Sequence, residues 1–118
     1  MMGTTAASLD EPIVKTTGAI TILDRKDSVL SEPTACIHCG RCIRSCPLDL
    51  SPVAYSKALE CESQEEKIAI LDKNKIMLCM ECGCCSFVCP ASRPLVQNNR
   101  IAKAEYREHQ AAMAKLKK

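Results

Sequence analysis

Eight cysteines of the chain fall into two copies of one pattern. The pattern is C-x2-C-x2-C-x3-C-P, and the second copy lies 43 positions after the first. The first copy consists of Cys36, Cys39, Cys42, Cys46 and Pro47, and the second of Cys79, Cys82, Cys85, Cys89 and Pro90. Gly40 and Gly83 also occupy the same place in both copies, and the prolines Pro52 and Pro94 follow with a shift of one residue. Repetition of this kind predicts two copies of one supersecondary unit.

The use of these cysteines follows from the size and composition of the chain. A chain of 118 residues makes one small domain, and it holds ten cysteines but only two tyrosines, one phenylalanine and no tryptophan. Domains of this size often need a staple, which is either a disulfide scaffold in a secreted protein or metal ligation in a reducing compartment. No secretory signal is recognisable, and no apolar stretch approaches the roughly 18 residues of a membrane helix. Together with the spacing, this predicts metal ligation on the cytosolic side, with no direct membrane span.

The spacing fits an iron–sulfur cube better than any other metal group. A [4Fe–4S] cube needs four converging thiolates, and in ferredoxins with two clusters the fourth cysteine of such a run ligates the other cluster. We therefore predict two [4Fe–4S] clusters with crossed ligands. The first is expected to take Cys36, Cys39, Cys42 and Cys89. The second is expected to take Cys79, Cys82, Cys85 and Cys46.

Zinc is the alternative metal. Zinc sites made of four cysteines usually show two separated C-x2-C pairs. Neither copy has that form, and four cysteines within eleven residues (36–46) crowd one tetrahedral ion. The doubled run with its proline therefore favours iron and sulfur over zinc.

Three further residues lie close to the runs without fitting the pattern. Cys61 and Cys84 have no counterpart in the other copy, so we expect neither to be a ligand. Cys61 is interpreted as a small helix residue, and Cys84 as a neighbour that tunes a cluster by packing. His38 stands in the first loop where Glu81 stands in the second. It is expected to be a surface residue near the cluster, with a hydrogen bond or a pH-dependent potential as the alternative.

The expected secondary structure is mostly helical. β-Branched residues over 12–23 could form one or two short strands, and the polar stretch 24–35 predicts a loop. Ser51-Pro52 predicts a helix over 52–61. Ser63-Gln64-Glu65-Glu66 has the form of a capping box for a helix to about Asp72. Arg93-Pro94 opens a last helix whose apolar residues become sparse beyond Tyr106.

Each predicted helix has apolar positions that we expect to face the core. In the first these are Val53, Ala54, Ala58 and Cys61. In the second they are Ile68 and Leu71, and in the last Leu95, Ile101, Ala102 and Tyr106.

Positive charge collects at the C-terminal end. Residues 93–118 carry seven basic and two acidic side chains. The basic ones are Arg93, Arg100, Lys103, Arg107, Lys115, Lys117 and Lys118. Such a run is usually a solvated helix face, and the alternative is a surface for an acidic partner or an anionic membrane. With so few aromatic residues and no recognition helix, we expect no nucleic-acid partner.

Two stretches of the chain resemble the ferredoxin domain of the C subunit of the Rnf complex. The first is Glu32-Pro33-Thr34-Ala35-Cys36-Ile37-His38-Cys39-Gly40-Arg41-Cys42 with Cys46-Pro47-Leu48 and Leu50-Ser51-Pro52. The second and more specific one is Cys79-Met80-Glu81-Cys82-Gly83-Cys84-Cys85-Ser86-Phe87-Val88-Cys89-Pro90 with Pro94-Leu95-Val96-Gln97 and Ala102-Lys103. Residues 1–3 and 12–18 also resemble the segment that precedes the cysteine runs in this family. The Rnf complex is a membrane-bound oxidoreductase that couples electron transfer between ferredoxin and NAD to ion pumping.

The resemblance implies a fold and a setting for the chain. With the long connection from Pro47 to Leu78, it implies a mainly α-helical ferredoxin-type domain, with a short N-terminal β-hairpin as a further expectation. The expected division is a lead segment over 1–31, a two-cluster domain over 32–100 and a basic helix or tail over 101–118. Family members carry a flavin- and NADH-binding part upstream, so FMN and NADH are expected only there, and the chain is interpreted as a C-terminal fragment.

The predicted function is single-electron transfer by a subunit or domain of a larger complex. No general base stands beside a nucleophile, so we expect no catalytic site in the chain itself. The expected partners are other subunits of an Rnf-like complex and a soluble ferredoxin or flavin, with peripheral attachment to the cytoplasmic side of the membrane. The alternatives are an electron-transfer subunit of a soluble dehydrogenase or heterodisulfide-reductase-like complex, and a structural metal-binding module.

Overall fold

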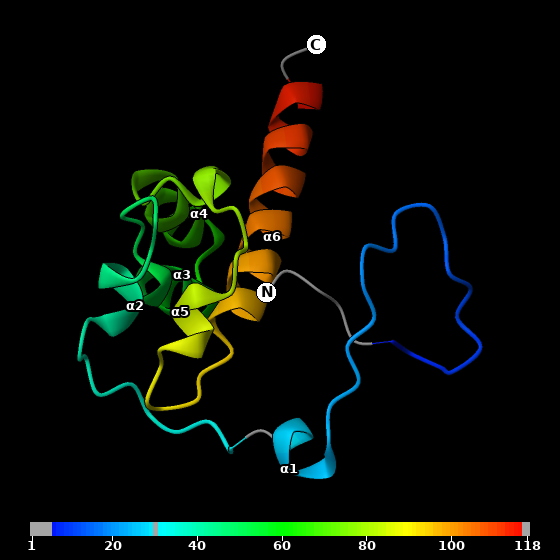
Figure 1. Ribbon diagram of the computed structural model, residues 1–118. Coiled ribbons are helices and arrows are strands. Elements are labelled where there is room, and N and C mark those ends of the chain that lie inside the picture. Colours follow the sequence, from blue (N-terminus) through cyan, green and yellow to red (C-terminus); the bar gives the residue numbers. More distant parts are fainter. Residues whose placement is uncertain (1–5, 30, 117–118) are drawn as a thin grey trace.

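The protein is an assembly of short helices around one long helix (Figure 1). The computed structural model describes residues 6–29 and 31–116. In chain order the elements are α1 (Arg25–Ser28), α2 (Arg41–Arg44), α3 (Pro52–Glu60), α4 (Gln64–Lys73), the 3-10 helix η1 (Ile76–Leu78), α5 (Cys84–Phe87) and α6 (Leu95–Leu116). Within the described residues there is no β-strand, which agrees with the predicted mainly helical class.

The N-terminal hairpin expected over 12–23 is wrong. These residues are exposed and form only a turn, in which the Thr17 N–H donates to the Val14 carbonyl at 2.9 Å. Figure 1 shows the segment looping away from the helices. β-Branched residues favour a strand only where a neighbouring strand and a packed face are available, and this segment has neither. In the stretch predicted as loop, Asp24 caps the four-residue helix α1.

Helix α3 begins where the sequence predicts and buries a different face. Pro52 occupies its first turn after Ser51, where its missing N–H leaves no hydrogen bond unmade. Ala58 is fully buried as predicted, but the centre of the inner face is Tyr55, which the sequence reading left out. Val53, Ala54 and Cys61 are only half-buried.

Helix α4 packs against α3 and is fixed to it by a tyrosine. Leu71 is fully buried, as predicted, and Ile68 is half-buried. Ser63 precedes α4, but its side chain makes no capping hydrogen bond, so the predicted capping box does not form. The hydroxyl of Tyr55 donates to the Asn74 carbonyl, just beyond the end of α4, at 2.6 Å. This bond satisfies one of the carbonyls that a helix leaves unpaired at its end.

Helix α6 is the long element against which the others pack. Leu95, Ala102 and Tyr106 are buried, as predicted, whereas Ile101 is 51% exposed and that prediction is wrong. One residue along a helix turns the side chain by about 100°, so Ile101 lies outside the stripe that contains Ala102. The boundary predicted at residue 100 falls within this helix, and the division into segments stays a prediction.

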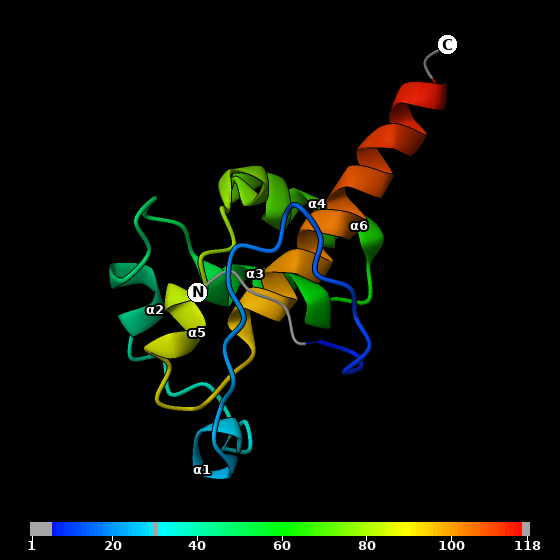
Figure 2. The ribbon, with the colours of Figure 1, turned by 45° about the vertical axis from the view of Figure 1, so that its right-hand side comes forward.

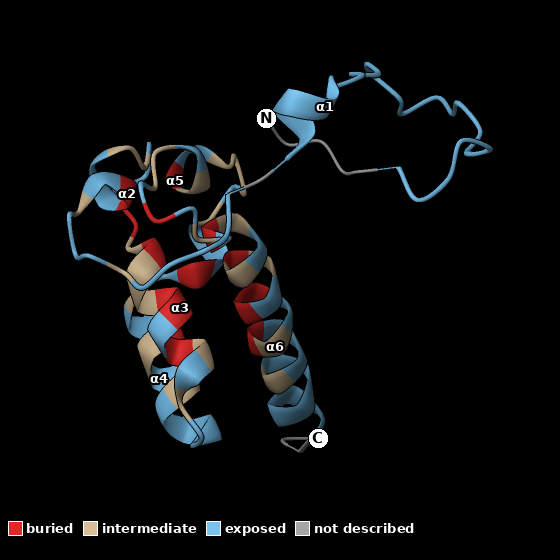
Figure 3. Cartoon of the chain, turned by 90° about the horizontal axis from the view of Figure 1, so that it is seen from below, coloured by how far each residue is buried: buried red, intermediate tan, exposed pale blue. Residues whose placement is uncertain are grey.

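Two groups of buried side chains hold the helices together. The larger joins α3, α4 and α6, and it includes Leu50, Tyr55, Ala58, Leu71, Ile76, Ala102 and Tyr106. Figure 3 shows the buried residues on the sides where α3 and α6 face each other. The smaller group contains Cys42, Cys85 and Leu95 and lies under α2 and α5, which are side by side in Figure 2. No helix in the described part of the chain combines the length and hydropathy needed to cross a membrane.

Candidate metal centres

The two cysteine runs adopt the same backbone conformation. Six of the seven described residues in the left-handed region form three pairs 43 positions apart, and only Lys75 has no counterpart. The pairs are His38 (φ 54°) with Glu81 (φ 58°), Gly40 (φ 70°) with Gly83 (φ 83°), and Asp49 (φ 50°) with Ser92 (φ 49°). Glycine adopts this conformation freely, while other residues lose about 1–2 kcal/mol. Strain repeated at matching places indicates that both loops are shaped for one purpose.

The hydrogen bonds of the two runs repeat as well. In each copy a short helix follows the glycine, and the N–H three residues after it bonds back to the glycine carbonyl, from Ile43 at 3.1 Å and from Ser86 at 3.0 Å. The fourth cysteine lies just past the short helix, with its N–H bonded into it, in Cys46 at 3.0 Å and in Cys89 at 3.2 Å. The repeat in the sequence is therefore a repeat of structure. In each run the short helix contains the third cysteine, and the fourth follows after its end.

The first predicted ligand set lines one cavity. This cavity has a volume of about 190 Å³, and its walls include Cys36, Cys39 and Cys42 of the first run and Cys89 of the second. The remaining walls come from α3, the start of α6 and the loops beside the cysteines. The structure thus brings together three thiols of one run and the fourth thiol of the other. That they ligate a cluster stays a prediction.

Burial makes the Cys42 thiol a poor anion. Cys42 is buried at the base of its helix. Burial raises the pKa of the Cys42 thiol more than backbone hydrogen bonds lower it, and negative charge on Cys89 or Cys36 raises it further. Several thiolates at this place therefore need a cation among them. Iron supplies that charge, so the donor set fits an iron–sulfur cluster.

In the second predicted ligand set, the three thiols of the second run lie within electrostatic reach of one another. Burial raises the pKa of the Cys85 thiol to about 11, and negative charge on Cys79 and Cys82 contributes to that rise. Cys46 of the first run packs against the buried group that contains Tyr55. Burial raises the pKa of the Tyr55 hydroxyl to about 12, with added repulsion from Cys79 and Cys46. Cys46 and Cys79, one from each run, both pack against the buried group that contains Tyr55, and their ligation of one cluster stays a prediction.

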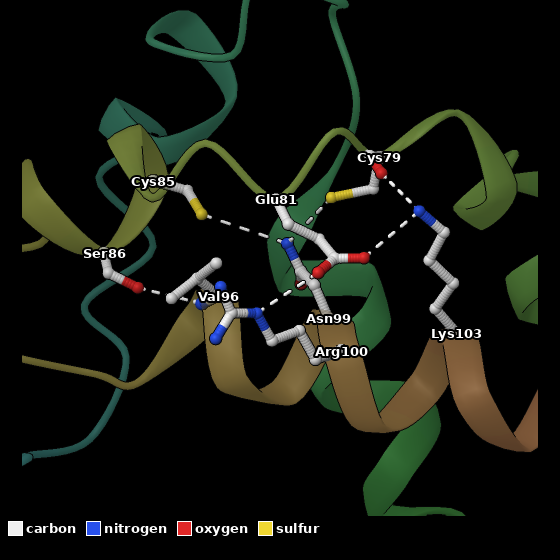
Figure 4. Close-up of polar contacts among 8 residues, drawn as sticks. All are labelled: Cys79, Glu81, Cys85, Ser86, Val96, Asn99, Arg100 and Lys103. Atoms are coloured by element: carbon white, nitrogen blue, oxygen red, sulfur yellow. Dashed lines mark hydrogen bonds and ion pairs between the residues drawn. The ribbon is translucent and has the colours of Figure 1, made fainter. Parts of the chain in front are cut away.

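Helix α6 contacts the second cysteine loop with polar side chains (Figure 4). The buried amide of Asn99 donates through Nδ2 to Cys79 Sγ at 3.6 Å and to Cys85 Sγ at 3.9 Å. The Lys103 ammonium donates to the Cys79 carbonyl at 2.6 Å and to Glu81 Oε1 at 3.2 Å. The sequence reading missed Asn99. Its signal was a polar residue placed one turn from Leu95 and Ala102 on the apolar stripe of the helix.

Three basic side chains of the C-terminal run form ion pairs within the molecule. Arg100 Nε donates to Glu81 Oε2 at 3.2 Å, so Glu81 receives both Arg100 and Lys103. Burial by itself raises the pKa of the Glu81 carboxyl, but hydrogen bonds from Lys103 and Arg100 and their charges hold it below its usual value. Arg93 pairs with Glu60 at 3.4 Å. Carboxylates on neighbouring elements thus reach these three basic residues, and the role of the basic run stays a prediction. Lys117 and Lys118 lie outside the described residues.

Cys61, Cys84 and His38 are not among the predicted ligands. The backbone N–H of Cys84 lowers the pKa of the Cys82 thiol by hydrogen bonding to it, and the two side chains are also hydrogen-bonded. Cys84 itself is exposed. The thiol of Cys61 donates to the Lys57 carbonyl of its own helix at 3.4 Å. His38 is exposed and lines the first cavity. Over residues 6–29 and 31–116, no three His, Cys, Asp or Glu side chains stand as a ready site for a single metal ion.

Known proteins share the cysteine region and much of the rest of the chain. Residues 35–93 match the family described as "4Fe-4S dicluster domain". The C subunit of the Na(+)-translocating ferredoxin:NAD(+) oxidoreductase complex of Acetobacterium woodii is 41% identical over 105 residues, which are 89% of this chain and 23% of that protein. The C subunit of the ion-translocating oxidoreductase complex of Rhodobacter capsulatus is 36% identical over 111 residues, which are 94% of this chain and 21% of that protein. The chain therefore spans less than a quarter of the length of these relatives.

Proposed function

Since the chain belongs to the 4Fe–4S dicluster family, we propose that it passes single electrons through two [4Fe–4S] clusters inside a larger oxidoreductase complex. It is related to the C subunit of Rnf-type, ion-translocating complexes, and the similarity covers most of its length. Iron–sulfur electron transfer is the function that family and relatives share. The number of clusters and the complex around them belong to the proposal.

The crossed arrangement of the thiols is the observation that carries the proposal. Cys89 lines a cavity with Cys36, Cys39 and Cys42. Cys46 lies beside the same tyrosine as Cys79. In the proposed arrangement each run lends its fourth thiol to the other, so neither group is complete without both runs. Two mutually dependent sites of four thiols favour two cubes over two independent zinc ions.

The protein groups hold and insulate the clusters. Bound [4Fe–4S] clusters supply one-electron redox chemistry, and their potentials depend on ligation, hydrogen bonds to sulfur and exposure. Cys42 of the first site and Cys85 of the second lie in one buried group with Leu95, so the two sites share part of a buried wall. Ligation also replaces the unfavourable charge of buried thiolates, so cluster binding contributes folding free energy to this small domain.

We also propose the setting of the chain from its relatives. Their names make them subunits of ion-translocating oxidoreductase complexes, which supports other subunits of an Rnf-like complex as partners and a peripheral position on the cytoplasmic side of the membrane. A soluble ferredoxin or a flavin is the proposed electron partner. Mixing the loaded chain anaerobically with reduced ferredoxin should transfer electrons to its clusters, so that the EPR signal of the chain's reduced clusters appears as the signal of reduced ferredoxin declines. No such exchange would argue against that partner.

The first experiment is anaerobic purification with iron and acid-labile sulfide analysis, followed by EPR before and after dithionite reduction. About eight irons and eight sulfides per chain, with a signal from two interacting clusters after reduction, would support the proposal. Stoichiometric zinc that persists through iron–sulfur reconstitution, without a reducible centre, would refute it and leave a structural metal module.

Single substitutions then test the crossing. Cys89→Ser should perturb the same EPR component as Cys36→Ser, and Cys46→Ser the same component as Cys85→Ser. Cys61→Ser is the matched control, because its thiol bonds to a carbonyl of its own helix, and it should retain full iron. Crossing is wrong if Cys89→Ser instead perturbs the component that Cys85→Ser perturbs.

A further inference from the structure

Asn99 is the one polar side chain of α6, within the described residues, that reaches sulfur atoms of two predicted ligands. Its Nδ2 lies 3.6 Å from Cys79 Sγ and 3.9 Å from Cys85 Sγ. The residue is 2% exposed. Figure 4 shows its amide between the two cysteines, with the rest of α6 below it. The amide is therefore buried beside the sulfurs of the second predicted site.

We propose that Asn99 is a positioning residue of the second cluster, whose amide hydrogen bonds to the Cys79 and Cys85 sulfurs raise the reduction potential of that cluster alone. The inference rests on the proposed function, since it needs two clusters. It assigns a hydrogen-bond contribution to the reduction potential of this cluster to a residue outside both cysteine runs.

The unpaired oxygen of the same amide supports a functional role for the contact between Asn99 and the two sulfurs. Asn99 Oδ1 is buried and has no hydrogen-bond partner among the described residues. A buried acceptor left unpaired destabilises the fold, and leucine, which branches in the same way and has no polar atom, would avoid this at a helix–core position. Thiolates only accept hydrogen bonds, so an amide beside them must turn its NH2 group toward them. The oxygen is then left without a donor, as Asn99 Oδ1 is here.

The first site has a different residue in the corresponding place. Moving back 43 positions from Asn99 leads to Ser56, which lines the first cavity. The Ser56 hydroxyl accepts a hydrogen bond from Asn98 Nδ2 at 3.1 Å. Over 6–29 and 31–116, the structure gives no side-chain nitrogen that donates to a sulfur of the first group. The two clusters are thus inequivalent although their loops repeat.

The position of the Asn99 amide is fixed by neighbours on both sides. The backbone N–H of Val96 donates to Ser86 Oγ at 2.8 Å, and Lys103 holds the Cys79 carbonyl at 2.6 Å. These contacts lie one turn to either side of Asn99 along α6. The distance from amide to sulfur is therefore set by a rigid helix and does not depend on a loop.

The sign of the effect follows from charge. Reduction adds one negative charge to the cluster and its thiolates. A donor to those sulfurs stabilises the more negative state more strongly, so it raises the potential. Removing the donor should lower the potential of the second cluster, and the first cluster serves as an internal reference.

The test is an EPR-monitored redox titration of the full chain with Asn99→Leu, after iron and sulfide analysis of each protein. We expect one of the two potentials to fall, with the oxidised-to-reduced equilibrium changed by up to about tenfold, or about 59 mV for one electron. Asn98→Leu is the matched control, since Asn98 is the adjacent amide and bonds to Ser56. It should leave both potentials in place.

Asn99→Asp is the second variant, because it keeps the shape and, at a pH where the new carboxyl is ionised, removes the donor and adds negative charge. Its shift should have the same sign and be at least as large. For the case that neither variant loads, wild-type chain labelled with ¹⁵N in its asparagine side chains should show a nitrogen coupling at the reduced second cluster by pulsed EPR. Selective loss of one cluster in both Asn99 variants, with Asn98→Leu intact, also supports the role.

Three results would overturn the inference. They are full iron with both potentials unchanged in Asn99→Leu, an equal shift in Asn98→Leu, or no ¹⁵N coupling in the labelled wild type. Failure of the proposed function looks different. It is a wild-type chain without two reducible clusters, which the iron analysis detects before any variant is compared.

Discussion

Replacing the buried Lys103 with methionine should destabilise the second cysteine loop more than removing the more exposed charge of Arg100. The Lys103 side chain is 11% exposed, and its ammonium makes two bonds, to the Cys79 carbonyl at 2.6 Å and to Glu81 at 3.2 Å. Methionine keeps the apolar stem and removes the charge. It leaves a carbonyl and a carboxylate without the donor that both now use.

The magnitude lies between that of a surface pair and that of a buried pair. Exposed ion pairs contribute about 0–1 kcal/mol, whereas removing one partner of a buried pair costs about 3–5 kcal/mol. Glu81 is 28% exposed and keeps its ion pair with Arg100, which reduces the penalty for losing Lys103. The lost hydrogen bond to the Cys79 carbonyl adds about 1.5–3 kcal/mol because its donor is charged. We expect Lys103→Met to lower the free energy of unfolding by about 2–3 kcal/mol.

Arg100→Met is the control for this measurement. Arg100 bonds to the same carboxylate at 3.2 Å, but its side chain is 36% exposed. Its loss should cost about 0.5–1 kcal/mol. Anaerobic urea unfolding of the loaded chains, followed by circular dichroism, measures both. Equal losses for the two variants, or less than about 1 kcal/mol for Lys103→Met, would refute the reasoning that the buried carbonyl contact dominates.

The same network predicts a dependence on acid. The pKa of the Glu81 carboxyl is held below its usual 4.5 in the folded chain. A depressed folded-state pKa gives stability that is complete above the unfolded-state pKa and is lost as the pH falls through the folded one. The difference in unfolding free energy between wild type and Lys103→Met should therefore be constant above about pH 5 and shrink below about pH 4.5.

Three further changes have definite outcomes. Tyr55→Phe should lower the free energy of unfolding by about 1–2 kcal/mol in urea, because it leaves the Asn74 carbonyl without its donor; no loss would mean that water replaces the hydroxyl. Tyr106→Phe should cost about 1 kcal/mol near neutral pH and remove an alkaline loss of stability. The hydrogen bond to Asp72, with burial, raises the pKa of the Tyr106 hydroxyl above 10, so its stabilisation is complete below pH 10 and fades as the pH rises through the higher folded-state value; equal alkaline titrations of the two proteins would contradict this. Cys61→Ser should leave iron and sulfide content unchanged, and a loss of iron would make Cys61 a ligand.

The cysteine repeat could be recognised from the sequence because its constraints are local. Spacing and glycine placement fix how a loop of this length closes, and the left-handed pairs from His38 with Glu81 to Asp49 with Ser92 recur at the same interval of 43. The starts of α3 and α4 were predictable for the same reason, since Pro52 and the residues after Ser63 act within one turn of the helix. Crossing of the fourth cysteines also follows from the spacing, as a rule for this kind of run.

What the sequence by itself determined is therefore the metal chemistry and the mainly helical class, because both depend on residues near one another in the chain. Only the tertiary structure decided which residues of α6 face the second site. Asn99 and Lys103 lie 20 and 24 positions beyond Cys79, and no local pattern says that a lysine in a basic stretch is buried against a carbonyl. The absent hairpin over 12–23 has the same cause. A strand, like a buried polar contact, exists only if a distant segment supplies the partner, and packing in three dimensions decides which segments meet.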